Sequence, residues 1–273
     1  TTTVLVPAMI QACLVMVPDV KDRDYSSLKA MVYGASPIAE ETLRGAMETF
    51  DCDFYQAFGM TETTSSVVYL NAEDHVRALK EKPELLLAAG RAITGTHIRI
   101  VDENDQDVPV GEVGEIICKG PQIMQGYWNM EEATAEALRD GWMHTGDAAS
   151  MDKEGYVYIQ DRIKDMIVSG GENVYPREVE NALFEHPAIV DAAVFGIPGA
   201  KFGEDVMATV VLKEGESLSE EDVIDFCRTK LGGYKIPRQV SFMEELPRNA
   251  SGKVLKKDLR EPYWEGHTRR VSG

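Results

Sequence analysis

The sequence predicts an α/β fold followed by a smaller α+β fold. Two apolar runs of strand length flank a helical stretch near the N-terminus, and short β runs separated by Gly, Asp and Pro turns follow between about 90 and 160. From Met166 onward, strands alternate with helices in a compact order. The chain has 273 residues, of which 44% are hydrophobic, so it can bury more than one core.

We expect two domains with a boundary near Arg162. The first domain, residues 1–161, divides into a sheet portion at 1–89 and a β-rich subdomain at 90–161. The second domain comprises residues 162–273.

The first local pattern is a β-α-β unit. The apolar run Lys29 to Tyr33 predicts a buried strand, and the next segment, Gly34-Ala35-Ser36-Pro37, predicts a helix start with Ser36 as its cap. A helix over 38–50 then leads to a second strand from Asp53 to Phe58, which we expect to end in a tight turn at Gly59. Loops at the carboxyl ends of parallel strands commonly bind ligands.

The remaining elements follow from the same rules. In the β-rich subdomain the predicted strands are 97–101, 113–118 and 155–159. In the second domain we expect a strand after Met166, a helix opened by Pro176, strands at 188–197 and 205–212, a helix at 219–231 and a strand at 238–243.

Charge and cysteine content exclude several classes of function. The formal net charge is -18, which argues against general nucleic-acid binding, although the C-terminal segment clusters Lys253, Lys256 and Lys257. This local basic segment suits phosphate-bearing small molecules, or is simply a solvated tail. Four scattered cysteines argue against a zinc site or a disulfide framework and favour the cytoplasm.

Neither a membrane span nor a secretory signal is predicted. The longest apolar stretch, Val4 to Val17, is interrupted by Pro7 and Gln11 and is too short to cross a bilayer. The chain begins at Thr1 without an initiator Met, from which we expect a truncated sequence. The sequence does not indicate an oligomeric state.

The strongest local signal is the segment Tyr55 to Thr63, YQAFGMTET. There, Thr61 and Glu62 present a hydroxyl and a carboxylate together, a pair suited to a phosphate oxygen and to magnesium. The alternative is a simple helix cap.

Three further segments carry chemistry of the same kind. Asp147 in GWMHTGD lies behind a Gly turn, where it can accept bonds from ribose hydroxyls or be only a turn acid. Arg162 suits ribose or phosphate, or else pairs with Asp161 or Asp165, and Gly170-Gly171 permits close backbone approach.

The third of these segments is PRNASGKVLKKDLR, residues 247–260. It sets Lys253 after a Ser251-Gly252 turn, where its long side chain can reach a ligand phosphate or remain solvated.

Taken together, these motifs resemble the adenylate-forming superfamily, which comprises acyl-CoA synthetases, peptide-synthetase adenylation domains and luciferases. The resemblance covers residues 30–62, 90–180 and 232–260. It is strongest for the fatty-acid or aryl-acid CoA ligase branch, through FGMTE, GEIICKGPQIMQGYW, DRIKDMIVSGGENVYP and LGGYKIPR.

The resemblance implies a two-step ligase. A carboxylic acid, fatty or aromatic, and ATP give acyl-AMP and pyrophosphate, and a rotation of the mobile C-terminal domain then lets the thiol of coenzyme A attack the adenylate. The partners implied are thus the acid, ATP and coenzyme A, with magnesium on the nucleotide.

The resemblance also implies a role for each candidate residue. Lys253 stabilises negative charge during adenylation. The adenine contacts are Gly34, Ala35, Ser36 and the stacking Phe58, while Thr61 holds the α-phosphate and Glu62 the magnesium. The remaining roles are ribose binding for Asp147 and Arg162, the hinge for Lys164, and the approach to coenzyme A for Gly170, Gly171, Glu172, Tyr234 and Lys235.

One departure from the family pattern affects the expected activity. Relatives carry an upstream Ser/Thr/Gly-rich loop ending in Pro-Lys-Gly that grips the β- and γ-phosphates, and this sequence has no such segment. We therefore expect a fragment of a protein about twice as long, and we expect the isolated chain to be unable to form acyl-adenylate. Two alternatives stay open, a non-catalytic AMP-binding fragment and an adenylation domain that loads a carrier protein.

Overall fold

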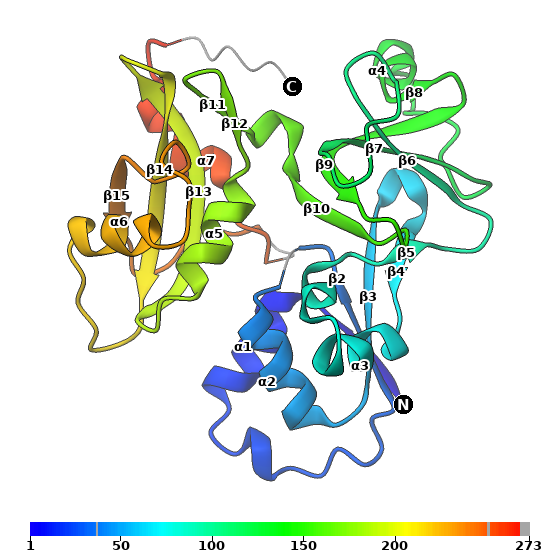
Figure 1. The fold of residues 1–273 in the computed structure, drawn as a ribbon. Coiled ribbons are helices and arrows are strands. Elements are labelled where there is room, and N and C mark those ends of the chain that lie inside the picture. The colour runs from blue at the N-terminus through cyan, green and yellow to red at the C-terminus, as the bar shows by residue number, and fades with distance from the viewer. Residues whose placement is uncertain (37, 250–251, 268–273) are drawn as a thin grey trace. The chain divides into compact units, whose positions relative to one another are not determined.

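The computed structural model describes residues 1–36, 38–249 and 252–267, so Pro37 and Ser251 of the predicted turns lie outside the described residues. The chain divides into two compact units, Thr1–Ile159 and Gln160–Gly273 (Figure 1). The expected combination of an α/β fold with an α+β fold is confirmed.

The first unit contains an α/β layer built on the sheet β1-β2-β3-β4-β5. Strands β1, β2 and β3 are parallel, and β4 and β5 are antiparallel additions. The helices α1, α2 and α3 pack on one face of this sheet, where Ile10, Leu43 and Ala78 share a buried cluster with Tyr33 and Phe54. The elements are β1 (Thr2–Leu5), α1 (Pro7–Met16), β2 (Ala30–Gly34), α2 (Glu40–Phe50), β3 (Asp53–Met60), β4 (Ser65–Leu70), α3 (Ala72–Lys80) and β5 (Arg91–Ala92).

A second sheet, in the order β10-β9-β7-β6 with β8 paired to β9, forms the β-rich part of the first unit. A cluster containing Val68, Ile116, Met143 and Val157 joins this sheet to the end of the first one. The elements are β6 (His97–Val101), β7 (Gly114–Lys119), α4 (Glu131–Ala137), β8 (Leu138–Arg139), β9 (Trp142–Met151) and β10 (Val157–Arg162), whose last residues belong to the second unit.

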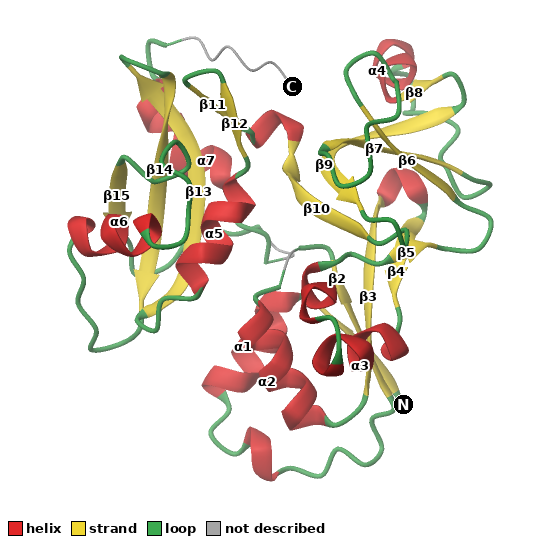
Figure 2. Ribbon diagram, viewed as in Figure 1, coloured by secondary structure: helices red, strands yellow, loops and turns green. Residues whose placement is uncertain are grey.

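The second unit is a mixed sheet with helices on both faces (Figure 2). Strands run in the order β12-β11-β14-β13, and β15 pairs parallel with β14. Val179 of α5 and Val223 of α6 pack with Val194 on one face, whereas Leu259 of α7 packs with Phe195 on the other. The elements are β11 (Ile167–Ser169), β12 (Glu172–Val174), α5 (Pro176–Phe184), β13 (Ile189–Gly199), β14 (Gly203–Leu212), α6 (Glu220–Arg228), β15 (Gln239–Phe242) and α7 (Lys256–Trp264).

Two local predictions in the β-α-β unit are wrong. The helix α2 begins at Glu40 after Ala39, which has no side-chain cap bond, so Ser36 is not its cap. Gly59 is not in a tight turn but within β3, beside a register shift. A Cβ on Gly59 would lie 1.7 Å from the carbonyl oxygen of Ser65, so glycine is needed there for close backbone approach.

The turn predicted before Asp147 is also wrong. Residues Trp142–Met151 form the long strand β9, which the sequence analysis missed. Gly146 has φ of 70° at a register shift between β7 and β9. It therefore forms a bulge inside a strand, a position that favours glycine.

Candidate functional site

The predicted adenine contacts lie at the ends of two neighbouring parallel strands. Gly34 at the end of β2 pairs with Ala57 of β3. A Cβ on Gly34 would lie 2.2 Å from the carbonyl oxygen of Ala57, so the two backbones approach closely only because residue 34 is glycine. Beyond it, Ala35 is exposed with φ of 64°, Ser36 is half-buried, and Phe58 is half-buried on the adjacent strand.

The Thr61-Glu62 pair lies in a tight 3-10 turn, Thr61–Thr63, between β3 and β4. The backbone N–H of Met60 donates to Oγ1 of Thr63 at 2.9 Å, and Thr63 is fully buried. Thr64 then takes φ of 48°, which reverses the chain. Thr63 thus anchors the turn from its buried side, whereas Thr61 is exposed.

A tyrosine that the sequence analysis did not single out orients Glu62. The hydroxyl of Tyr127 donates to Oε1 of Glu62 at 2.8 Å, and the carbonyl of Glu62 accepts from the backbone N–H of Met124 at 2.7 Å. Oγ1 of Thr64 donates to the carbonyl of Gln122 at 2.8 Å. Residues 122–127 thus hold the turn in place. Their only signal in the sequence was their membership of the GEIICKGPQIMQGYW motif.

Asp147 is buried on β9, with 7% of its surface exposed. Its backbone N–H donates to Oγ1 of Thr145 at 3.1 Å, and that hydroxyl donates to the carbonyl of Ile116 at 2.7 Å. The N–H of Gly146 donates to Oε1 of Glu115 at 2.9 Å. These bonds fix the bulge that carries the Asp147 side chain.

Arg162 and Lys164 lie in the first segment of the second unit. The backbone N–H of Arg162 donates to Oδ1 of Asp161 at 2.7 Å, and Lys164 is exposed within the short 3-10 helix Ile163–Asp165. Both acids of this segment form ion pairs with α7, through Lys256–Asp161 at 3.0 Å and Arg260–Asp165 at 3.1 Å.

The Gly170-Gly171 pair forms the turn of the β11–β12 hairpin. Their φ values of 65° and 90° suit a type I′ turn, which requires positive φ at both central residues. The N–H of Gly170 donates to the carbonyl of Phe202 at 2.9 Å. Glu172 follows on the exposed start of β12.

Lys235 forms an ion pair with Glu178, whereas Tyr234 is exposed to solvent. Nζ of Lys235 donates to both carboxylate oxygens of Glu178 on α5, at 2.6 and 2.7 Å. Burial alone would lower the pKa of Lys235, but the hydrogen bonds and charge of Glu178 outweigh it and the pKa is raised. Tyr234 is 41% exposed.

Beside Tyr234 and Lys235, the structure has an open pocket of about 250 Å³ that the sequence analysis did not identify. Two arginines line it, and each has a carboxylate partner: Arg228 pairs with Asp225, and Arg238 lies 3.9 Å from Asp205. The lining residues are Ile224, Arg228, Gly233, Ile236, Pro237 and Arg238.

Lys253 is exposed, and Asn249 and Arg248 hydrogen-bond to the backbone of Lys253 and Gly252. The N–H of Lys253 donates to Oδ1 of Asn249 at 2.9 Å, and its carbonyl accepts from the N–H of Asn249 at 3.0 Å. Arg248 donates to the carbonyl of Gly252 at 2.6 Å and also pairs with Asp191 at the start of the sheet. These bonds anchor the backbone of Gly252 and Lys253.

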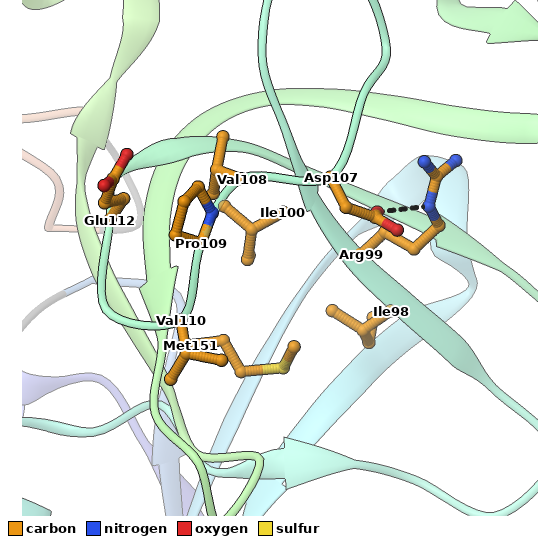
Figure 3. Close-up of a pocket in the computed structure, with 9 residues that line it drawn as sticks. All are labelled: Ile98, Arg99, Ile100, Asp107, Val108, Pro109, Val110, Glu112 and Met151. Carbon is orange, nitrogen blue, oxygen red and sulfur yellow. Dashed lines mark hydrogen bonds and ion pairs between the residues drawn. The ribbon is translucent and has the colours of Figure 1, made fainter.

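Within each unit, the structure brings some predicted residues together. Gly34 and Phe58 lie on adjacent strand ends, and Thr61 and Glu62 share one turn. A pocket of about 180 Å³ in the β-rich sheet, lined by residues such as Ile98, Val108 and Met151, contains none of the predicted site residues (Figure 3). Two of its charged residues, Arg99 and Asp107, form an ion pair with each other at 2.6 Å.

Two features are absent from the part of the chain that the structure describes. Residues 1–36, 38–249 and 252–267 contain no group of three or more His, Cys, Asp or Glu side chains placed to hold a metal ion. Across the same part of the chain, no helix has the length and apolar character needed to cross a membrane.

Comparison with protein families gives two matches. The family described as AMP-binding enzyme matches residues 1–128, and the AMP-binding enzyme C-terminal domain matches residues 178–253. These two ranges contain most of the predicted site residues, among them Glu62 and Lys253.

Individual relatives and structures agree with the family matches. A fatty acid–[acyl-carrier-protein] ligase of Streptomyces coeruleorubidus is 41% identical over 100% of this chain and 51% of its own length. A medium/long-chain-fatty-acid–CoA ligase of Mycobacterium tuberculosis is 39% identical over 99% of the chain and 48% of its own.

The o-succinylbenzoate CoA synthetase of Bacillus subtilis, solved with an acyl-adenylate intermediate, matches with a TM-score of 0.82 and 35% identity, over 95% of this chain and 50% of that one. The chain spans about half the length of the curated relatives it matches.

Proposed function

This chain belongs to the AMP-binding enzyme family, and we propose that the protein carrying it is an AMP-forming acid–thiol ligase. The ligase joins a carboxylic acid to ATP as acyl-AMP, releases pyrophosphate, and passes the acyl group to coenzyme A. The acid is fatty or aromatic, in keeping with the apolar surroundings of the Tyr55 to Thr63 segment. The free cysteines suit a reducing cytoplasm.

Adenylation requires stabilisation of charge on the α-phosphate. As the carboxylate oxygen attacks phosphorus, negative charge grows on the phosphate oxygens and then leaves with pyrophosphate. The exposed ammonium of Lys253 supplies a positive charge on a braced loop, and the exposed hydroxyl of Thr61 supplies a neutral donor. Both act by electrostatics and hydrogen bonding rather than by proton transfer.

Glu62 fits the magnesium that such a reaction uses. Tyr127 occupies Oε1 and so orients the carboxylate, which is half-buried in a fixed turn. Magnesium in nucleotide sites commonly takes only one or two protein carboxylates, the other ligands being phosphate oxygens and water. A single glutamate is therefore sufficient. The metal would neutralise phosphate charge, and Glu62 would hold it.

The thioester step uses the second unit differently. The Gly170-Gly171 hairpin presents a backbone without side chains, which suits the narrow pantetheine arm of coenzyme A. The exposed Tyr234 and the arginine-lined pocket beside it are the proposed contacts for an adenine and its phosphates. Asp147 and Arg162 are the proposed ribose contacts, Gly34 to Ser36 and Phe58 the proposed adenine contacts, and Lys164 the proposed hinge.

The observation that carries the proposal is that one chain, matched by both family models, contains a fixed Thr61-Glu62 turn in its first unit and Lys253 with an anchored backbone in its second. The test is ATP–pyrophosphate exchange with a panel of fatty and aromatic acids, followed by detection of acyl-CoA. Exchange that depends on the acid supports the proposal. Absence of exchange with every acid, in a folded full-length protein, contradicts it.

A second candidate function differs only in the acceptor. The 41% identity to a fatty acid–[acyl-carrier-protein] ligase favours transfer to a carrier-protein thiol. Competition assays with coenzyme A and a phosphopantetheinylated carrier protein separate the two, because the preferred acceptor discharges the adenylate faster.

A non-catalytic AMP-binding role for the 273-residue chain alone is tested by calorimetry. Binding of AMP without pyrophosphate exchange supports that role, and normal exchange by the isolated chain contradicts it.

A further inference from the structure

A buried lysine lies next to the proposed catalytic loop. Lys256 is the first residue of α7, and its Nζ lies 3.0 Å from Oδ2 of Asp161 and 2.9 Å from Oε1 of Glu180. All three side chains are largely buried, with exposed fractions of 17%, 12% and 7% in that order. A charge held this far from water needs such partners.

Each carboxylate ties the lysine to a different element. Oε1 of Glu180, on α5, also accepts the backbone N–H of Val194 on β13 at 2.9 Å, so this partner is fixed to the sheet. Oδ1 of Asp161 accepts the backbone N–H of Arg162, while Oδ2 faces Lys256. The carboxylate of Asp161 therefore links Lys256 to the backbone of Arg162, the proposed ribose contact.

The same helix holds the other end of the segment. Arg260 lies one helical turn after Lys256, on the same face of α7, and pairs with Asp165 at 3.1 Å. The two ion pairs flank Arg162 and Lys164, so the segment 161–165 is attached to α7 at both ends.

The loop of Lys253 enters directly into this helix. Lys253 precedes Lys256 by three residues, and the N–H of Leu255 donates to the carbonyl of Pro247 at 2.8 Å. Together with the Asn249 and Arg248 contacts, this bond closes the loop onto the helix start. Any shift of the first turn of α7 therefore shifts Lys253.

We propose that Lys256 is a positioning residue for adenylation: its ion pairs with Asp161 and Glu180 hold the Lys253 loop and the Arg162 segment as one rigid body. The proposal rests on the adenylation function proposed above. It gives the buried ion pairs a role beyond stability, because two groups that act on one nucleotide would keep a fixed spacing whenever the second unit moves.

The charge state supports this role. Burial alone would lower the pKa of Lys256, but the charges and hydrogen bonds of Asp161 and Glu180 outweigh it and the pKa is raised. Lys256 is therefore charged at neutral pH. Its removal takes the closest cation away from two buried carboxylates and leaves Arg177, which lies 3.9 Å from Oε2 of Glu180, as a more distant one.

The test compares Lys256→Met with Lys256→Arg and with Lys257→Met, a matched control at the neighbouring exposed lysine of the same helix. Backbone amide exchange is measured on the 273-residue chain by NMR. In Lys256→Met, the amides of Arg162 and Lys253 exchange at least about tenfold faster, while the amides of β13 and β14 keep their wild-type exchange rates. Lys256→Arg and Lys257→Met keep the wild-type rates.

Two results would overturn the proposal: unchanged protection of Arg162 and Lys253 in Lys256→Met, or equal acceleration of every amide in the unit. The second result would indicate global destabilisation rather than local positioning.

Pyrophosphate exchange by the full-length protein gives the functional readout. Lys256→Met lowers kcat about ten- to a hundredfold, and Lys256→Arg restores most of it. In a Lys253→Ala background, Lys256→Met has a smaller further effect, because the part of its effect that passes through Lys253 is already lost and only the part through Arg162 remains. Full additivity of the two losses would contradict the proposal. A wild type without exchange would count against the proposed function alone, because amide exchange still decides whether Lys256 couples the two segments.

Discussion

At the residue scale, the orientation of Glu62 depends on a hydroxyl 65 positions further along the chain. Tyr127 holds Oε1 of Glu62 through a hydrogen bond, and this also fixes the direction in which Oε2 points. A hydrogen bond to a charged group contributes about 1.5–3 kcal/mol, enough to decide which rotamer the glutamate adopts. The site therefore includes a supporting residue that no local pattern around Glu62 contains.

Tyr127→Phe is predicted to reduce pyrophosphate exchange about tenfold and to raise the magnesium concentration needed for half-maximal rate, because the carboxylate loses its orienting bond. Glu62→Gln is expected to reduce exchange at least about a hundredfold. The control is Tyr263→Phe, which removes a hydroxyl from α7. Equal effects of Tyr127→Phe and Tyr263→Phe would argue that the Tyr127 bond is not used.

A buried histidine gives the first unit a defined pH response. His75 is fully buried, with its Nδ1 2.7 Å from the carbonyl of Asn71 and its Nε2 2.9 Å from the hydroxyl of Tyr33. A carbonyl only accepts, so Nδ1 carries the proton. Burial lowers the pKa of His75, even though the Asn71 bond and Asp74 oppose it.

Because the folded pKa of His75 lies below its unfolded value of about 6.5, its contribution to stability is present above that pH and is lost as pH falls. Wild type should lose up to about 1.4 kcal/mol of unfolding free energy per pH unit below about 6.5 from this group. Urea unfolding at several pH values checks it, with His75→Gln as the reference. Parallel curves for the two proteins would contradict the assignment.

At the element scale, close backbone approach decides where glycine is required. Gly34→Ala is predicted to destabilise the protein by about 1–3 kcal/mol, because the new methyl group would overlap the carbonyl of Ala57, which is part of a strand and cannot move away. Gly233→Ala, with nothing within 4 Å of its Cβ, is the matched control. Urea unfolding measures both, and similar midpoints would refute the steric account.

Sequence patterns predicted the elements whose signal is local. The strand at 97–101 matches β6, and the helix opened by Pro176 begins at that residue, because alternating apolar residues and a proline at the first turn act over a few positions. The strand β9 was missed because Gly146 and Asp147 are of residue types depleted in strands, and only pairing with β7 keeps this segment in the sheet.

Long-range contacts account for the rest. Pro262 lies inside α7 and obscures its helical pattern, although the helix is held by Leu259 against the sheet and by the ion pairs of Lys256 and Arg260. Likewise, the sequence motifs identified Glu62 and Lys253 as candidate site residues. They did not indicate Tyr127, or Asp161 and Glu180 as partners of Lys256, since those contacts depend on tertiary structure.

At the scale of the whole molecule, each unit has its own hydrophobic core. The clusters around Tyr33 and around Ile116 draw only on the first unit, and those around Val194 and Phe195 draw only on the second. Separate cores are what a domain needs to fold alone and to move as a body.

We therefore predict that residues 160–273, produced alone, unfold cooperatively in urea and keep protected amides in β13 and β14. A non-cooperative transition, or loss of protection in these two strands, would show that the second unit depends on the first for its structure.

The most direct test of the proposed function is ATP–pyrophosphate exchange by the full-length protein, measured in wild type, Lys253→Ala and Lys257→Ala. We predict exchange that requires a fatty or aromatic acid, falls about a hundred- to a thousandfold in Lys253→Ala and is unchanged in Lys257→Ala. All three proteins should unfold at the same temperature, because both lysines are exposed. Acid-dependent exchange that survives in Lys253→Ala would contradict the role assigned to this lysine, and no exchange with any acid would contradict the ligase itself.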